Sequence, residues 1–365
     1  MEKEINVEYI HLSNLSITNL LNCLKDSNVK EQFKNDIGDQ KYQKIVKEMR
    51  NESTIIAMRD LHNWIKNILI ANTVILYKQT TRQAGQPQIA LLDIAVGRGG
   101  DLAKWNKAGI NYVYGFDVSD KSINSKDPED QGAKERLSNF KNIRIKDVHF
   151  EVGNAMKPSV ELKRSINGFL ENNKLELFNI VSCQFALHYF FKSEETLRNV
   201  LKMVSDSLSV GGFFIGTTID GDAIKKLFKN TKERVYSTQL FRIERNFPKT
   251  VTKPFGNEYS FTIFDTFDKS NYFNTMGVST EYLVNFKKLE EVAKDYSLEL
   301  IKVNLFDDYS LGKTVKFTEV KKSVISFEDI HELGKWKHRP ENREITEPEL
   351  EINKLYSAFI FKKVN

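Results

Sequence analysis

The spacing of hydrophobic residues changes along the chain, and the change predicts where helices and strands lie. From residue 53 onward, apolar residues recur at intervals of three and four, as in an amphipathic helix. A polar loop is expected over 80–88. After it the apolar residues form short runs, which are typical of buried strands. These runs cover residues 89–95, 112–118, 148–152, 177–182 and 213–218.

Helical patterns separate these runs, as at 101–108 and 194–208. Such alternation predicts βαβ units, and therefore an α/β domain with a mostly parallel central sheet and helices on both faces. Gly211 and Gly212 are expected to form the turn into the fifth strand. Further on, 259–267 and 356–362 alternate in the manner of strands, and 283–296 is helical in pattern.

Two polar segments flank or interrupt this pattern. Residues 1–52 are expected to form an N-terminal helical extension or linker, with helices at 16–27 and 41–52, before a domain that spans 53–365. Residues 311–347 are expected to be an insertion on the surface. The first ten residues lack an apolar signal core, and no run approaches the ~20 apolar residues of a membrane span. We therefore expect no membrane association and a cytoplasmic location.

Composition adds two constraints. Cys23 and Cys183 are the only cysteines and form no CxxC pair, so we expect neither a disulfide framework nor a zinc site, and no other metal. The net charge of +5 is compatible with a polyanionic partner and equally with an ordinary solvated surface. Basic clusters at 225–234 and 335–339 leave the same two interpretations open: an RNA path or a solvated face.

The segment 92–101 carries the first candidate chemistry. It follows the first predicted strand, opens a helix, and has the form AxGxGG from Ala95, where a dinucleotide-binding loop would have GxGxxG. Ligands of open parallel sheets bind at such carboxyl ends. Asp93 before the turn and Asp101 after it favour S-adenosylmethionine over a dinucleotide. The alternative for Asp93 is a carboxylate that caps the loop amides.

The ends of the next strands add further candidates. Asp117 can accept hydrogen bonds from both ribose hydroxyls of an adenosine, whichever cofactor carries it. Asn154 is expected to contact the adenine amino group, or else to be a turn asparagine. Phe185, His188 and Tyr189 follow the fourth strand at spacings of three and four, which predicts one helix face. Such aromatic residues either stack on a flat base or belong to the core.

The segment Ser182-Cys-Gln-Phe-x-x-His188-Tyr189 resembles the mRNA cap guanine-N7 methyltransferases of eukaryotes and viruses. The resemblance covers roughly residues 55–362. It implies a Rossmann-like class I methyltransferase fold, S-adenosylmethionine as cofactor (with S-adenosylhomocysteine as product), and capped RNA as substrate. Matching motifs occur in the same order at 61–70, 97–102, 211–218, 280–284 and 355–356.

The resemblance also implies roles for individual residues. The expected cofactor-binding residues are Lys66, Asp93, Ala95, Gly97, Asp101, Asp117, Asn154 and Gln184. The expected cap-binding residues are His62, Asn63, Arg98, Phe185, His188, Tyr189, Glu281 and Tyr356. Arg98 would contact the phosphates, and Glu281 the guanine N1–H and amino group. The alternatives are a helix N-terminal carboxylate for Glu281 and a core residue for Tyr356.

Four positions depart from the family pattern. The first loop glycine is Ala95, which costs little if its φ is negative, and the usual aspartate against adenine is Asn154. The usual asparagine at position 62 is His62, and the loop lysine is Arg98, which keeps the positive charge. These departures put the loop geometry and one cap contact in question.

The expected reaction needs positioning rather than a catalytic acid or base, because guanine N7 offers a free lone pair. Two other functions are compatible with the sequence: a methyltransferase for a small metabolite, and a silent RNA-binding or stimulatory subunit. Triphosphatase and guanylyltransferase domains of the same capping enzyme are expected partners if the source is viral. In that case the protein would be located in a viral factory or in the virion. A nuclear location is the alternative.

Overall fold

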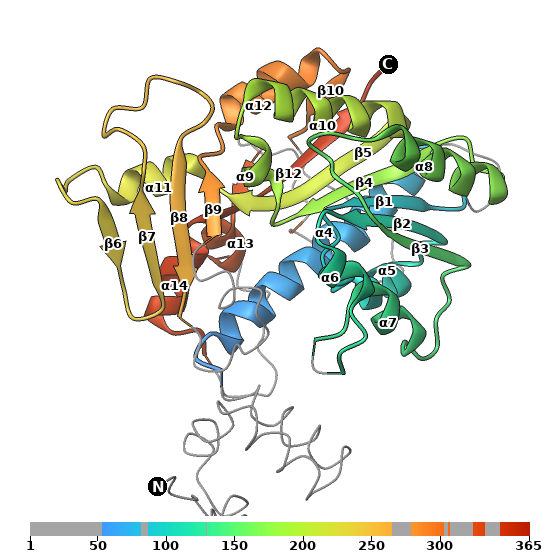
Figure 1. The fold of residues 1–365 in the computed structure, drawn as a ribbon, viewed down its shortest axis with the longest axis horizontal. Helices are drawn as coiled ribbons and strands as arrows, with labels where there is room; N and C mark the ends of the chain where they lie inside the picture. The colour runs from blue at the N-terminus through green and yellow to red at the C-terminus, as the bar shows by residue number, and fades with distance from the viewer. Residues whose placement is uncertain are drawn as a thin grey trace, which may run out of the picture.

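The computed structural model describes residues 53–81, 87–128, 130–264, 279–302, 306, 324–332 and 344–365. The helices expected at 16–27 and 41–52, the basic cluster at 335–339 and most of 311–347 lie outside the described residues. Figure 1 shows the described part as a large twisted sheet flanked by helices, with a smaller sheet beside one of its ends.

The main sheet confirms the expected α/β architecture. Its strands run in the order β10-β12-β5-β4-β1-β2-β3, and β11 pairs with β12. All pairs between β3 and β5 are parallel, whereas β12 is antiparallel to β5. The strands are β1 Ala90–Ile94, β2 Tyr112–Asp117, β3 Asp147–Val152, β4 Phe178–Gln184, β5 Leu208–Ile219, β10 Leu298–Leu300, β11 Val324–Ser326 and β12 Tyr356–Lys363.

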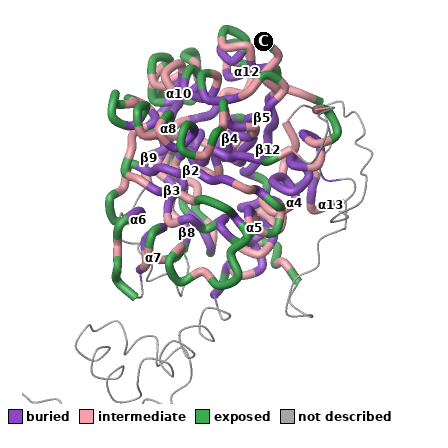
Figure 2. Tube along the Cα trace, turned by 90° about the vertical axis from the view of Figure 1, so that its right-hand side faces the viewer, coloured by how far each residue is buried: buried purple, intermediate pink, exposed green. Residues whose placement is uncertain are grey.

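Helices cover both faces of this sheet (Figure 1). The amphipathic pattern from residue 53 forms α4 (Ile56–Thr80), which packs with α5 (Leu102–Ala108) on one face. The other face carries α8 (Val160–Asn172), α10 (Glu194–Ser207) and α12 (Phe286–Lys294). Figure 2 shows the buried residues concentrated along the strands, with exposed residues on the outer turns of the helices.

The alternation of side chains along each strand explains this two-sided core. Leu91 belongs to the apolar cluster under α4, whereas its neighbour Leu92 belongs to the cluster under α8 and α10. Both faces are buried, so β1 is apolar at almost every position, as a central parallel strand must be. The sheet is therefore a rigid support that brings its loops to one carboxyl edge.

A second, antiparallel sheet was not expected, apart from one strand. It consists of β6 Val235–Ser237, β7 Phe241–Arg245, β8 Glu258–Ile263 and β9 Ser279–Tyr282, paired in that order. Helix α11 (Gly221–Leu227) connects it to β5. Glu281 lies within strand β9. The alternative interpretation of Glu281 as a helix N-terminal carboxylate is therefore wrong.

Two local differences from the expected structure are informative. The turn expected at Gly211 and Gly212 lies within β5, in a bulge between the Phe178–Leu208 and Ile180–Phe213 pairs, and Gly211 has a φ of 81°. Within the expected surface insertion, β11 pairs with β12, and α13 (Phe327–Glu332) buries Phe327 completely. These described parts of 311–347 belong to the packed core.

Four short helices complete the described part. They are α6 Asp120–Asn124, α7 Ala133–Ser138, α9 Leu187–Phe190 and α14 Glu347–Asn353. Thr346 and Glu349 form a capping box at the start of α14, and Glu349 Oε1 also accepts a bond from Met58 N at 2.9 Å. The C-terminal region is therefore fastened to α4, which lines the site.

Candidate active site

The loop after β1 has the shape that a glycine-rich loop requires. Ala95, Gly97 and Gly99 have φ values of 59°, 55° and 66°. We expected alanine at position 95 to cost little conformational energy only if its φ were negative. Its φ is positive, so that condition is not met. An alanine in the left-handed region costs roughly 1 kcal/mol relative to glycine. Ala95 therefore adopts a backbone conformation that favours glycine, at the cost of local strain.

Asp117 fastens this loop to the end of β2. Its Oδ2 accepts a bond from Gly97 N, and its Oδ1 one from Ser119 N, both at 2.9 Å. Burial raises the pKa of Asp117, and these two amide bonds act in the opposite direction. A carboxylate has about four lone-pair positions, so two stay available for ribose hydroxyls.

Lys66, Asp101 and Lys104 form a compact ion cluster beside the loop. Asp101 Oδ1 lies 2.7 Å from Lys66 Nζ and 2.8 Å from Lys104 Nζ. Burial alone would raise the pKa of Asp101, but the two ammonium groups lower it to about 2. Two cations against one anion leave a net positive charge here, which suits the carboxylate of a methionine moiety.

Asp93 does not cap the loop amides; Asp117 has that role. Asp93 Oδ1 is buried without a hydrogen-bond partner among the described residues. Burial, reinforced by the neighbouring Asp101, raises the pKa of Asp93 well above its usual range. A buried polar atom without a partner costs about 1–3 kcal/mol, and a bound ligand can remove that cost.

Asn154 and Gln184 are both held by neighbours. Asn154 Oδ1 accepts a bond from Met156 N at 2.9 Å, which is the turn role that we considered as its alternative. Gln184 Oε1 accepts a bond from Thr217 Oγ1 at 2.9 Å, and its amide donates to Ser182 Oγ at 3.2 Å. Their contacts to a cofactor stay predictions.

Four aromatic rings pack against one another beside the loop, and we call this group the aromatic enclosure. His62 stacks on Phe185 with centroids 5.3 Å apart and an interplanar angle of 22°. Phe327 and Tyr356 meet His62 edge to face at 5.0 and 4.8 Å. His62 Nε2 lies 2.7 Å from Asn353 Oδ1, and burial lowers the pKa of His62 to about 3. His62 is therefore a neutral ring with one nitrogen already engaged.

The single helix face expected for Phe185, His188 and Tyr189 is wrong. Helix α9 begins only at Leu187, and Phe185 precedes it with a φ of 56°. That left-handed residue turns the Phe185 ring toward His62 instead. His188 and Tyr189 remain together, with their rings 4.3 Å apart.

A polar edge borders the enclosure. Glu281 is buried, and its Oε2 and Oε1 accept bonds from Tyr259 Oη and Ser279 Oγ, each at 2.8 Å. His188 Nε2 lies 3.7 Å from Glu281 Oε1 and has no hydrogen-bond partner in the described chain. Burial lowers the pKa of His188, although Glu281 opposes that shift. A neutral imidazole and a carboxylate thus lie side by side at the edge of the aromatic enclosure.

Arg98 is oriented by the segment that follows α6. Its Nη1 pairs with the Asp130 carboxylate and donates to the carbonyls of Asp130 and Gln131, at 2.5 and 3.3 Å. Lys121 also pairs with Asp130, at 2.8 Å. Because these contacts use one nitrogen, the Nε/Nη2 edge is the one left to meet a phosphate.

The structure thus brings most of the predicted residues to one edge of the sheet, but not all of them. Asn63 is exposed on α4, with no described contact to this group. The sequence patterns did not indicate Lys104, Asp130, Tyr259, Phe327 and Asn353. Only Lys104, one helical turn after Asp101, carried a local signal; the others come from segments whose pairing is not visible in the sequence.

The buried histidines His62 and His188 predict acid sensitivity of folding. Their folded pKa values lie below the unfolded value of about 6.5, so below pH 6.5 the unfolded chain binds protons that the folded chain excludes. The free energy of unfolding should fall by up to about 1.4 kcal/mol per pH unit for each histidine. Urea denaturation between pH 6.5 and 5 measures this; His62→Asn should make the fall shallower, and an unchanged slope would contradict the prediction.

Comparison with known proteins decides the family. The profile of the mRNA (guanine-N(7))-methyltransferase domain matches residues 25–364. The chain belongs to this family. It is 32% identical over 263 residues to the mRNA cap guanine-N(7) methyltransferase of Schizosaccharomyces pombe, covering 71% of this chain and 64% of that protein. It is 29% identical over 327 residues to mRNA cap guanine-N(7) methyltransferase 1 of Oryza sativa subsp. japonica, covering 87% and 77%.

Solved structures resemble the chain more distantly. The CcbJ methyltransferase of Streptomyces caelestis aligns with a TM-score of 0.44 and 12% identity over 81% of this chain and 90% of that one. An S-adenosylmethionine-dependent methyltransferase from Clostridium acetobutylicum aligns with a TM-score of 0.43 and 12% identity over 85% and 93%. The strand order and family membership, rather than these alignments, support the Rossmann-like class I fold.

Proposed function

We propose that this chain transfers a methyl group from S-adenosylmethionine to guanine N7 of an RNA 5′ cap. The observation that carries the proposal is the polar edge of the aromatic enclosure. A neutral His188 can donate from Nε2, and Glu281 accepts; guanine presents a carbonyl oxygen next to N1–H and an amino group. The donor–acceptor order of the protein therefore complements guanine and opposes adenine.

The residues around the loop fit the cofactor. The left-handed backbone at Gly97 and Gly99 allows a ligand to approach closely, and Asp117 keeps two acceptor positions for ribose. The Lys66–Asp101–Lys104 cluster supplies charges of both signs for an amino-acid end. The unpartnered Asp93 oxygen adds a further hydrogen-bonding atom. When bound, S-adenosylmethionine supplies the electrophilic methyl group.

The chain's own contribution to the reaction is positioning. Phe185 and Tyr189 would hold the plane of the base, while His188 and Glu281 would fix its rotation in that plane. Arg98 would hold the phosphates through its open edge. N7 attacks with its own lone pair, so no side chain needs to remove a proton. The neutral state of His188 matters, because a positive charge would disfavour a base that gains positive charge.

Two rival functions are less compatible with this geometry. A methyltransferase for a small metabolite would not need both the polar edge formed by His188 and Glu281 and a phosphate-binding role for Arg98. A silent binding subunit would not need to keep the glycine loop and the Asp117 carboxylate that fastens it. Tight S-adenosylmethionine binding in calorimetry, followed by methyl transfer, would exclude the silent subunit.

Several finer features belong to the proposal as well. They are an extension at 1–52 preceding a methyltransferase domain, a cytoplasmic location, and capping-enzyme partner domains. The relatives named above come from a fungus and a plant, so the viral source stays a prediction.

The direct test compares methyl transfer to the same RNA prepared either with a GpppN cap or with a 5′ triphosphate. The proposal predicts transfer to the capped RNA and background transfer to the uncapped one, because only the capped RNA presents a guanine on inverted phosphates. Equal transfer to both would contradict it.

A further inference from the structure

The positive charge of this protein is concentrated in one short stretch. Residues 221–257 contain nine lysines and arginines against three acidic residues, a net charge of +6, whereas the whole chain carries +5. The rest of the chain is therefore close to neutral. Such a local excess creates a positive potential over one part of the surface.

The fold gathers this charge at one end of the four-stranded sheet. The register places Val235 opposite Glu244 and Arg245 opposite Tyr259. The loop before β6 and the loop between β7 and β8 therefore emerge at the same end. Both loops are basic. We call this the basic end; its exposed cations are Lys226, Lys229, Lys232, Arg234, Lys249 and Lys253.

Most of these cations are not neutralised by the protein. Lys225 pairs with Asp222, and Arg242 with Glu244 at 3.0 Å. For Lys226, Lys229, Lys232, Lys249 and Lys253 no ion pair occurs within the described ranges. Their ammonium groups are therefore available to an anionic partner.

A buried arginine organises the two basic loops. Arg245 donates from Nε to the Glu233 carbonyl at 3.1 Å, and from Nη1 to the Phe247 carbonyl at 3.1 Å. Its guanidinium also lies 5.7 Å from the centroid of the Phe228 ring. Its described partners are carbonyls and a ring rather than a carboxylate, so its charge adds to the potential of the basic end.

The basic end adjoins the cap enclosure. Gly256 N donates to the Phe191 carbonyl at 2.9 Å, directly after α9, which carries His188 and Tyr189. Leu283 N donates to the Asn257 carbonyl at 3.0 Å, two residues from Glu281. A chain whose first base occupies the enclosure can therefore continue onto these loops.

We propose that the basic end binds the phosphate backbone of the RNA body downstream of the cap. This inference rests on the proposed cap function, and it adds a second contact surface for the same substrate. Backbone contacts of lysine carry no sequence information, so the surface should accept any single-stranded sequence. Contacts of this kind make affinity strongly dependent on salt.

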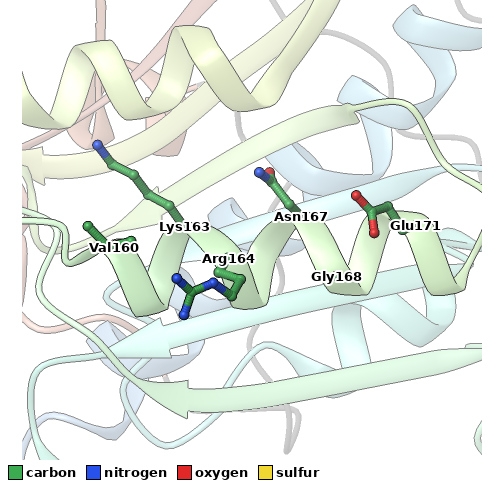
Figure 3. A pocket seen from close by; sticks show the side chains of 6 residues that line it. All are labelled: Val160, Lys163, Arg164, Asn167, Gly168 and Glu171. Carbon is green, nitrogen blue, oxygen red and sulfur yellow. The ribbon is translucent and has the colours of Figure 1, made fainter.

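The test compares Lys229→Ala/Lys232→Ala with Lys163→Ala/Arg164→Ala. The second pair lies on α8, where Lys163 and Arg164 line an open groove (Figure 3), at the other side of the molecule from β6 to β9 in Figure 1. Both pairs are exposed and remove two charges. Binding of capped RNA of about 20 nucleotides is measured by fluorescence anisotropy against salt concentration.

In the Lys229/Lys232 variant we expect about tenfold weaker binding at low salt and a slope of log Kd against log salt shallower by about 1.4. Methylation of the dinucleotide GpppG by this variant should stay unchanged. The α8 variant should match the wild type both in RNA binding and in GpppG methylation. Equal loss of RNA binding in the α8 variant, or an unchanged salt slope in the Lys229/Lys232 variant, would overturn the proposal. So would a Lys229/Lys232 variant that loses only its binding to polyglutamate, because that result indicates an acidic protein partner. Failure of the wild type to methylate GpppG would instead refute the cap function, since binding is measured separately.

Discussion

Replacing Glu281 by glutamine should lower kcat/KM for capped RNA by about 10³-fold while the protein stays folded. In the proposed function, the carboxylate would accept from two guanine donors, N1–H and the amino group. An amide has only one acceptor oxygen, and its NH₂ would face one of those donors. Sites built to hydrogen-bond a substrate discriminate by 10⁴–10⁵ when a partner is mismatched, so about 10³ is a moderate expectation. Initial rates with GpppG-capped RNA measure it.

The structure offers a matched control for Glu281→Gln. Tyr259→Phe removes the hydroxyl that holds Glu281 Oε2 but keeps the carboxylate. We expect a loss of about tenfold or less, typical of one hydrogen bond. S-adenosylmethionine binding should be unchanged in both variants, which shows that the loop is intact. Wild-type activity in Glu281→Gln would mean that guanine is not recognised at this edge.

Replacing Asp117 by alanine should weaken S-adenosylmethionine binding by about 100-fold. The change removes the acceptor of the Gly97 amide and the predicted acceptor of the ribose hydroxyls. Hydrogen bonds to a charged group contribute about 1.5–3 kcal/mol each, so the loss of one or two explains this factor. Isothermal titration calorimetry with S-adenosylmethionine is the measurement.

Ser119→Ala is the control for Asp117→Ala. Ser119 bonds Asp117 through its backbone amide, which the substitution keeps, whereas its hydroxyl only accepts from Ser122 N at the start of α6. The affinity should therefore stay near that of the wild type. If Asp117→Ala binds as tightly as Ser119→Ala, the ribose is held elsewhere.

The parts of the fold that the sequence predicts well are those set by local periodicity. Strands β1 to β5 and helix α4 follow from the spacing of apolar residues, and the parallel order follows from their alternation. The topology then brings Asp93, Asp117 and Gln184 to the same edge, because each lies at or near the end of a parallel strand. That part of the candidate site therefore follows from the amino-acid sequence alone.

The rest depends on pairings between distant segments. Strands β6 and β9 have three and four residues, too few for a periodic signal, so the second sheet and the Tyr259–Glu281 pair stayed hidden. His62 and Asn353 meet across 291 positions. The positive φ of Ala95 and Phe185 is also invisible in the sequence, because neither residue type requires it.

The position of the transferred methyl group tests the central claim most directly. After reaction of the chain alone with S-adenosylmethionine and GpppN-capped RNA, nuclease digestion and mass spectrometry identify the modified nucleoside. We predict 7-methylguanosine released from the cap. A methyl group on a ribose oxygen or on an internal base, or an unmodified cap, would contradict this claim.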